Sequence, residues 1–238
     1  MKPKSNNIFH FTKSLDVLKL ILQNGVQPRY CLEDARWLGF GDHKYIAFPM
    51  SCFCDIPLSR ISEHTEFYGE YGIGLTKEWG QKNGLNPVIY SPNDGYTQNA
   101  LKHLLYTDFH KDIENEVHAH LYKIWSLLKP VSGNMIISNN NVPKEFHQEN
   151  EWRYVPDSGL NVLFQNEFDK YKDQKNKELE RFKLDILPSD IKYIFVPEDS
   201  DIPNLVNFIN NTLDSYPSND LKILQSRIIS LNTLKEDI

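Results

Sequence analysis

The segment Ile8-Phe9-His10-Phe11-Thr12, with the stretch that follows it to Gly25, determines how we expect the fold to begin. The first five residues predict a short strand. Ser14 is placed to cap a helix after this strand, and Gly25 is placed to end it. Between them, apolar residues recur at helical spacing: Leu15, Leu18, Ile21 and Leu22. This region therefore predicts a strand followed by an amphipathic helix.

Beyond this opening, strands and helices are mixed along the chain. Strands are predicted at residues 47–56, 71–76, 87–91 and 191–196. Helices are predicted at residues 59–67, 97–128 and 202–213, the second of them broken near Phe109-His110. Because strands and helices do not alternate regularly, we expect the α+β class. With no repeat and no convincing linker, residues 1–238 should form a single domain with a helical insertion at about 97–130.

The composition is that of an ordinary soluble protein. The chain has 238 residues, of which 40% are hydrophobic and 24% charged. Its net charge of −6 gives no electrostatic footprint for nucleic acid, and its three cysteines are too few for a secreted disulfide framework. Residues 1–7 lack the apolar segment of a signal peptide, and no stretch is apolar enough to cross a bilayer. We therefore expect a cytoplasmic protein without membrane association.

A second informative segment is Gln148-Glu149-Asn150-Glu151-Trp152-Arg153-Tyr154-Val155. As a strand, it would place Glu149, Glu151 and Arg153 on one face and the aromatic residues on the other. The two carboxylates would then lie roughly 7 Å apart on the same side. Such a pair on a rigid strand suits an acidic catalytic site, whereas a solvent-facing Glu/Arg ladder would show the same pattern. The pattern alone leaves both interpretations open.

His10 is a candidate functional residue in the first predicted strand. It lies between Phe9 and Phe11, and Thr12 shares its face of the strand. A histidine in this setting is commonly a half-buried structural residue. A functional role would require a partner that the pattern does not identify.

Three glycines in the segment from Tyr68 to Leu75 also need an explanation: Gly69, Gly72 and Gly74. They would allow the backbone to approach a flat or phosphorylated ligand closely. Their spacing matches neither a phosphate-binding loop nor a dinucleotide fingerprint. A turn and a strand packed tightly on a neighbour would also explain them, and on this segment alone we favour that interpretation.

Metal-binding and cysteine-based chemistry have little support. Cys52-x-Cys54 has no second cysteine pair, and His118-x-His120 lies in a helical pattern where positions i and i+2 diverge. We therefore expect no metal site. A nucleophile at Cys52 or Cys54 lacks an identifiable histidine partner, and buried free cysteines are commonly inert.

Several of these segments together resemble the AbiGi family of bacterial abortive-infection proteins. The similarity is carried by Ile8 to Val26, Ser51-Cys52-Phe53-Cys54-Asp55-Ile56-Pro57-Leu58, His64, Tyr68 to Leu75 and Glu149-x-Glu151-Trp152-Arg153. It is strongest over about the first 90 residues. The resemblance implies a role in phage defence, as the antitoxin-like partner of a nucleotidyltransferase-type toxin.

The opening segment is also similar, more distantly, to ADP-ribosyltransferase folds, including the DarT-type toxins. This resemblance implies an ADP-ribosyltransferase-like α+β fold, with a split mixed or antiparallel sheet as its core and NAD as substrate. It implies that His10 holds the NAD ribose and that Tyr68 or Tyr71 stacks on nicotinamide. It further implies that Thr12 and Ser51 add hydrogen bonds to NAD.

The same resemblance implies the catalytic residues. Glu151 would be the catalytic carboxylate, and Glu149 would position or deprotonate the acceptor. Cleaving the nicotinamide–ribose bond builds positive charge on the sugar, and a fixed carboxylate stabilises that charge best in a water-poor site. Phe11 departs from the pattern, since a glycine usually follows the first-strand histidine. The helical stretch at 97–128 is a second departure, because it could remodel the cleft.

Two functions from different classes follow. We favour a phage-defence protein that is an NAD-dependent ADP-ribosyltransferase, acting on a protein or nucleic-acid acceptor. The alternative is a non-catalytic antitoxin or regulator with a degenerate version of the fold, which binds a partner toxin. A metal-dependent nuclease ranks last, because it would need acids and histidines clustered around an open coordination site.

Overall fold

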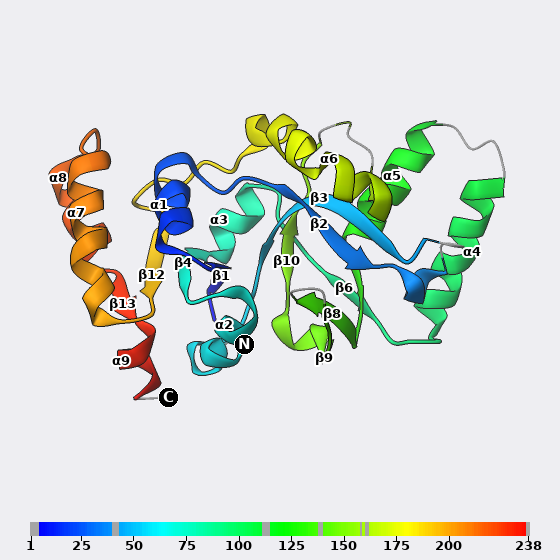
Figure 1. Ribbon diagram of the computed structural model, residues 1–238, viewed down its shortest axis with the longest axis horizontal. Coiled ribbons are helices and arrows are strands. Elements are labelled where there is room, and N and C mark those ends of the chain that lie inside the picture. The colour runs from blue at the N-terminus through cyan, green and yellow to red at the C-terminus, as the bar shows by residue number, and fades with distance from the viewer. Residues whose placement is uncertain are drawn as a thin grey trace. The chain divides into compact units, whose positions relative to one another are not determined.

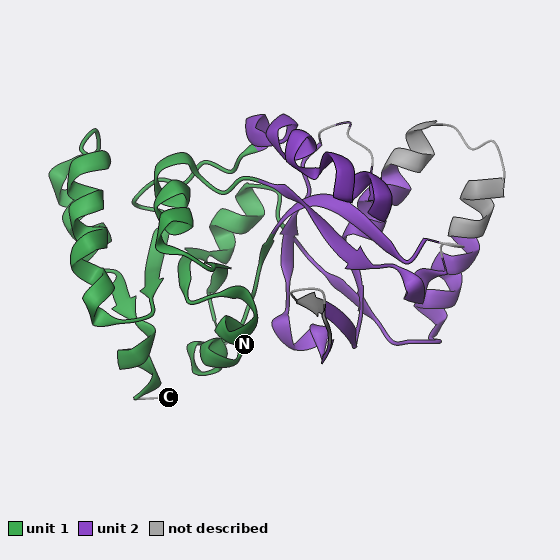
Figure 2. Ribbon diagram, in the orientation of Figure 1, with its two compact units in different colours: residues 1–27, 52–85, 183–238 green, residues 28–51, 86–182 purple. Residues whose placement is uncertain are grey.

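A computed structural model describes residues 5–39, 43–110, 115–137, 140–157, 159 and 162–236 (Figure 1). The chain divides into two compact units with interleaved segments (Figure 2). Unit 1 comprises residues 1–27, 52–85 and 183–238, and unit 2 comprises residues 28–51 and 86–182. Both units contain helices and strands, so the predicted α+β class is confirmed. Division into compact units does not by itself count folding domains, and the single-domain expectation stays a prediction.

Unit 1 is built on a mixed sheet. Its described strands are β1 (Asn7–Thr12), β4 (Tyr71–Thr76), β12 (Ile191–Val196) and β13 (Ile228–Ser230), in the order β1-β4-β12-β13. Each pair that includes β4 is antiparallel, whereas β12 and β13 are parallel. A parallel pair needs a long connection, and here it contains helices α7 (Ile202–Thr212) and α8 (Ser218–Gln225).

The predicted opening of the fold is confirmed. Strand β1 is followed by helix α1 (Leu15–Asn24), and the Ser14 hydroxyl accepts a hydrogen bond from the Val17 amide at 3.3 Å. Gly25 ends the helix with a φ of +84°. The remaining helices of unit 1 are α2 (Ile61–Tyr68), α3 (Lys77–Lys82), α9 (Leu231–Lys235) and the 3₁₀ segments η2 (Leu58–Arg60) and η5 (Asp199–Asp201).

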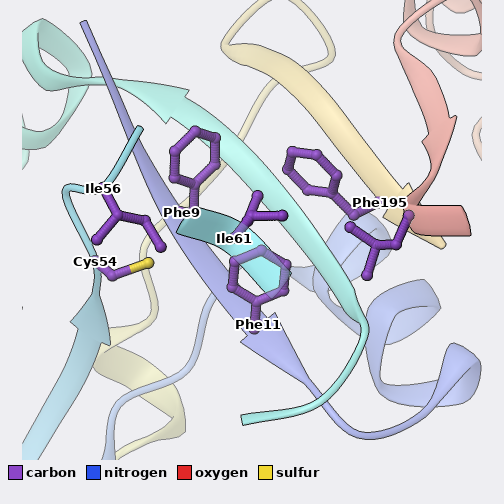
Figure 3. Close-up of a cluster of buried hydrophobic side chains, with 7 residues drawn as sticks. Phe9, Phe11, Cys54, Ile56, Ile61 and Phe195 are labelled. Atoms are coloured by element: carbon purple, nitrogen blue, oxygen red, sulfur yellow. The ribbon is translucent and has the colours of Figure 1, made fainter. Parts of the chain in front are cut away.

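One face of the unit 1 sheet packs on a cluster of buried apolar side chains. Phe9 and Phe11 of β1 gather there with Ile61 and Phe195 (Figure 3). In the register of β1 with β4, Phe9 lies opposite Gly74 and Phe11 lies opposite Gly72. A Cβ added at Gly72 would lie 2.6 Å from the Phe11 ring, and one at Gly74 would lie 2.9 Å from the Phe9 ring. These two glycines therefore make room for aromatic rings of the neighbouring strand.

Gly69 also lies close to a neighbouring segment, in this case to the backbone that follows β1. Its φ is +107°, and an added Cβ would overlap the Thr12 carbonyl and lie 2.7 Å from the Cα of Lys13. All three glycines thus approach the protein's own chain. The tightly packed turn and strand is the correct explanation of their spacing, and the close ligand approach is not needed.

Unit 2 is built on a second sheet. Its described strands are β2 (Arg29–Asp34), β3 (Tyr45–Phe53), β5 (Asn86–Pro87), β10 (Trp152–Tyr154) and β11 (Leu163–Phe164). The order is β11-β3-β10-β5, and β2 also pairs with β3. Helix α6 (Gln165–Glu178) follows β11 directly, and an apolar cluster that includes Tyr30, Ala47 and Leu163 packs against Phe168 of this helix. Three described 3₁₀ segments also belong to this unit: η1 (Arg36–Leu38), η3 (Phe146–Glu149) and η4 (Glu180–Phe182).

The predicted helical block lies between two short strands in the chain. Helices α4 (Tyr96–His110) and α5 (Asn115–Ser126) lie between β6 (Ile89–Ser91) and β7 (Leu128–Pro130), which pair in parallel. The described part of α4 ends at His110, and residues 111–114 lie outside the described residues, so the break expected near Phe109-His110 stays a prediction. Strands β8 (Gly133–Ile137) and β9 (Asn140–Lys144) then form an antiparallel pair. Among the described helices, none has the length and apolar character to cross a membrane.

We predict that Gly69→Ala destabilises the protein much more than Gly84→Ala. Both glycines have positive φ, but nothing lies within 4 Å of a Cβ added at Gly84. The Gly84 variant should lose about 1 kcal/mol from backbone strain alone, and the Gly69 variant about 3 kcal/mol because it also collides with Thr12. Urea unfolding measures both values. Equal losses would show that the close approach of Gly69 to β1 is not important.

Candidate functional site

Three of the predicted NAD-binding residues share one face of the β1–β4 pair. Thr12 lies directly opposite Tyr71 in the antiparallel register. Because side chains alternate along a strand, His10 lies on the same face as Thr12. The structure therefore brings together His10, Thr12 and Tyr71. Thr12 and Tyr71 are paired although they are 59 positions apart in the sequence.

The tautomer of His10 follows from its hydrogen bond. The Nδ1 atom lies 2.8 Å from the carbonyl oxygen of Cys52, and a carbonyl oxygen can only accept. Nδ1 therefore carries the proton and donates it, which leaves Nε2 of the neutral ring as an acceptor. Burial lowers the pKa of His10 more than this hydrogen bond raises it, and the ring packs against Phe53 with centroids 5.2 Å apart. At neutral pH His10 is thus an uncharged, half-buried hydrogen-bond acceptor.

The two candidate tyrosines lie on different sides of strand β1. The Tyr71 hydroxyl donates to Asp201 at 3.4 Å, and burial together with the charge of Asp201 raises the pKa of Tyr71. Tyr68 belongs to α2, where its ring stacks on His64 with centroids 4.4 Å apart. Tyr68 packs against the cluster that contains Phe11, which is on the face of β1 opposite to His10. Of the two tyrosines, only Tyr71 shares the His10 face.

The other predicted site residues belong to unit 2. Ser51 lies in β3 and is 3% exposed, and its hydroxyl has no hydrogen-bond partner among the described residues. Glu149 and Glu151 are each 5% exposed. The seven predicted residues are therefore divided between the two units, four in unit 1 and three in unit 2.

The prediction of a strand over Gln148 to Val155 is wrong for most of this segment. Only Trp152–Tyr154 forms a strand, and Glu149 ends the 3₁₀ segment η3 (Phe146–Glu149). Asn150 has a φ of +43°, a left-handed conformation that interrupts the extended backbone between the two glutamates. Glu149 and Glu151 therefore do not alternate along one strand. They meet instead through a shared cation, Lys129.

Six charged side chains form a cluster inside unit 2, and we call them the charged cluster: Glu33, Lys129, Lys144, Glu149, Glu151 and Arg153. Lys129 Nζ lies 2.9 Å from Glu151, 3.5 Å from Glu149 and 3.9 Å from Glu33. Lys144 Nζ lies 2.5 Å from Glu149. Since it holds three cations and three carboxylates, the charged cluster is electrically neutral.

Arg153 is the centre of the charged cluster and is fully buried. Its Nε donates to Glu151 Oε1 at 2.8 Å, and Nη1 donates to Glu33 at 3.0 Å. Nη1 also donates to the Ser126 carbonyl at the end of α5, at 2.5 Å. The guanidinium therefore links β2, α5 and β10.

The ionisation of Glu151 reflects these contacts. Burial by itself would raise the pKa of Glu151, but the charges of Arg153 and Lys129 and their hydrogen bonds outweigh it and hold the pKa well below its usual range. The same balance lowers the pKa of Glu149, through Lys129 and Lys144. Glu151 is thus a fixed anion with both oxygens bonded to cations, which makes it a poor proton acceptor.

The sequence patterns pointed to Glu149, Glu151 and Arg153 but missed Lys129, Lys144 and Glu33. Lys129 lies between two buried residues of β7, Leu128 and Pro130. A lysine between apolar neighbours in a short strand is the available signal, because a buried cation requires a carboxylate partner. No local pattern indicates Glu33, which lies 120 positions before Arg153.

No metal centre is found among the side chains that the structure describes, where no group of three or more His, Cys, Asp and Glu could hold an ion. The His118 side chain lies outside the described residues. Cys54 pairs with Phe9 through the backbone, and its side chain belongs to the apolar cluster of unit 1. The expectation of no metal stays a prediction.

Comparison with known proteins identifies the class of this chain. A family model described as "Putative abortive phage resistance protein AbiGi, antitoxin" matches residues 24–197. The curated "Abortive phage resistance protein AbiGi" of Lactococcus lactis subsp. cremoris is 30% identical over 244 aligned positions, which cover 88% of this chain and 98% of the relative. No solved structure matches significantly. These matches define an abortive phage resistance protein. Within that class, the chain belongs to the AbiGi family.

We predict that Glu151→Gln destabilises the protein by about 3 kcal/mol at pH 7, because it leaves the buried Arg153 and Lys129 undercompensated. The control Glu63→Gln, in a surface pair with Arg60 and 74% exposed, should cost less than about 0.5 kcal/mol. Because the pKa of Glu151 is lowered in the folded protein, its ionised carboxylate stabilises the fold at pH values above the unfolded-state pKa. This stabilisation is lost as the pH falls towards the folded-state pKa.

The difference between wild type and Glu151→Gln should therefore shrink on acidification below about pH 4.3. Urea unfolding at several pH values measures it. A difference that is small at pH 7, or that does not change with acid, would contradict the assignment of Glu151 as a buried anion.

Proposed function

We propose that this chain acts as an antitoxin in phage defence, binding a partner toxin without catalysing a reaction. The observation that carries the proposal is the state of Glu151, which is 5% exposed and bonded to Arg153 and Lys129. An oxocarbenium-like transition state needs a carboxylate whose charge is available to the sugar. The charge of Glu151 is already compensated inside the protein. The description of the AbiGi family as an antitoxin supports the same role.

The local contacts of two further predicted residues, Tyr68 and Glu149, also support this proposal. Tyr68 packs on the apolar cluster, and Glu149 is bonded to Lys129 and Lys144. Each of these side chains has a packing or charge-balancing role in its own unit, so neither requires NAD to explain it. The partner class that we propose is a nucleotidyltransferase-type toxin, as the sequence resemblance implies.

The antitoxin proposal predicts that the chain is harmless when expressed alone and restores growth when co-expressed with a nucleotidyltransferase-type toxin. A tagged copy should also retain that toxin on affinity purification, because neutralisation would occur by binding. The surface control Glu63→Gln should behave as wild type. Toxicity of the chain alone, or growth rescue without complex formation, would contradict the proposal.

One observation favours a second candidate, an NAD-dependent ADP-ribosyltransferase with the corresponding fold. His10, Thr12 and Tyr71 share one face, and Nε2 of His10 is suited to accept a hydrogen bond from a sugar hydroxyl. In this candidate, NAD would be the substrate, and Glu151 would act on it with Glu149 assisting a protein or nucleic-acid acceptor. Ser51 would use its buried hydroxyl as a further donor to NAD.

Incubation with labelled NAD and cell lysate distinguishes the two candidates. The antitoxin proposal predicts neither nicotinamide release nor label transfer. The enzyme candidate predicts both, with a loss of about 100-fold in Glu151→Gln at a temperature where circular dichroism shows the variant to be folded. Activity that persists in folded Glu151→Gln would exclude Glu151 as the catalytic carboxylate.

A further inference from the structure

Glu33 is the most exposed member of the charged cluster. Its side chain is 21% exposed, compared with 6% for Glu149 and Glu151 and 0% for Arg153. It projects from β2, whereas the two inner glutamates come from η3 and the residues just before β10. Glu33 therefore lies on the solvent side of the charged cluster.

The contacts of Arg153 are divided between an inner and an outer carboxylate. Nε donates to the inner Glu151 at 2.8 Å, and Nη2 donates to the same carboxylate at 3.2 Å. Both terminal nitrogens, Nη1 and Nη2, also donate to the outer Glu33. A carboxylate that bridges both terminal nitrogens of an arginine adopts the bidentate geometry by which arginine also binds phosphate. Lys129 Nζ, 3.9 Å from Glu33, adds a second cation beside that position.

The charge balance depends on Glu33. With its carboxylate in place, the charged cluster holds three cations and three anions. If the side chain of Glu33 rotated into solvent, one positive charge would remain uncompensated at the outer side of Arg153 and Lys129. A buried charge without compensation is costly, and an anion from solution at this position would restore the balance of charge.

We propose that Arg153 and Lys129 form a binding site for a phosphate-bearing anion, which the carboxylate of Glu33 covers in this structure. Glu33 is then an internal competitor that an incoming phosphate group displaces. Glu151 and Glu149 stay in place and keep the two cations oriented. This site lies wholly within unit 2 and does not depend on the antitoxin role.

The test uses the whole chain and follows binding of inorganic pyrophosphate and of ADP by calorimetry and ³¹P NMR at constant ionic strength. Glu33→Gln keeps the shape of the side chain but removes the competing charge, so pyrophosphate should bind about tenfold more tightly than to wild type. Asp34→Asn is the matched control, because Asp34 is the next carboxylate of β2 and pairs with the exposed Arg36. It should bind as wild type does.

Glu33→Asp provides a second variant that keeps the charge of the charged cluster. Its shorter side chain reaches Arg153 less well, so pyrophosphate affinity should also rise. Tighter binding of ADP than of pyrophosphate would identify a nucleotide ligand, and equal binding would identify the phosphate group alone. Equal pyrophosphate affinity in wild type, Asp34→Asn and either folded Glu33 variant overturns the proposal.

Discussion

The burial of Arg153 is the constraint on which the architecture of unit 2 depends. A guanidinium removed from water must be surrounded by acceptors, and each acceptor here comes from a different part of the chain. Arg153 donates to Glu33 of β2 and to the carbonyl of Ser126 at the end of α5. It also donates to Glu151, which lies just before β10. Apolar packing tolerates small shifts, whereas the bonds to Glu151 and to the Ser126 carbonyl hold the guanidinium in one orientation. Because the cost of removing these charges from water offsets much of their attraction, the charged cluster is weak evidence for net stability.

Local patterns predicted the parts of the fold that depend on neighbours in sequence. The Ser14 cap, the helix that ends at Gly25 and the alternation that joins His10 with Thr12 were all predicted correctly. The segment around Asn150 was not predicted correctly, because the left-handed backbone at Asn150 interrupts the strand and the neighbouring glutamates bind residues from distant segments. The partners of Arg153 lie up to 120 positions away, and no periodicity in a single sequence reports such a contact.

Membership of the AbiGi family gives a phage-defence context, and the chemistry of each unit then distinguishes between roles. In unit 2, Glu149 and Glu151 are bonded to cations and have lowered pKa values, so they resemble structural ions rather than reactive groups. Unit 1 keeps a neutral histidine whose second nitrogen is an unprotonated acceptor. The two units therefore differ in chemical character: unit 2 contains a neutral cluster of buried charges, and unit 1 contains a sheet with one apolar face and a polar residue, His10, on the other.

The order of strands in unit 1 has a consequence for synthesis on the ribosome. Strand β4 pairs with β12, which follows it by more than 100 residues, and β13 completes the sheet close to the carboxyl end. The whole of unit 2 beyond residue 85 is made before β12 emerges. Contacts of such long sequence separation slow folding, because a large loop must close before they form. Until then, β4 has an unpaired edge, so nascent chains are exposed to aggregation and to proteolysis.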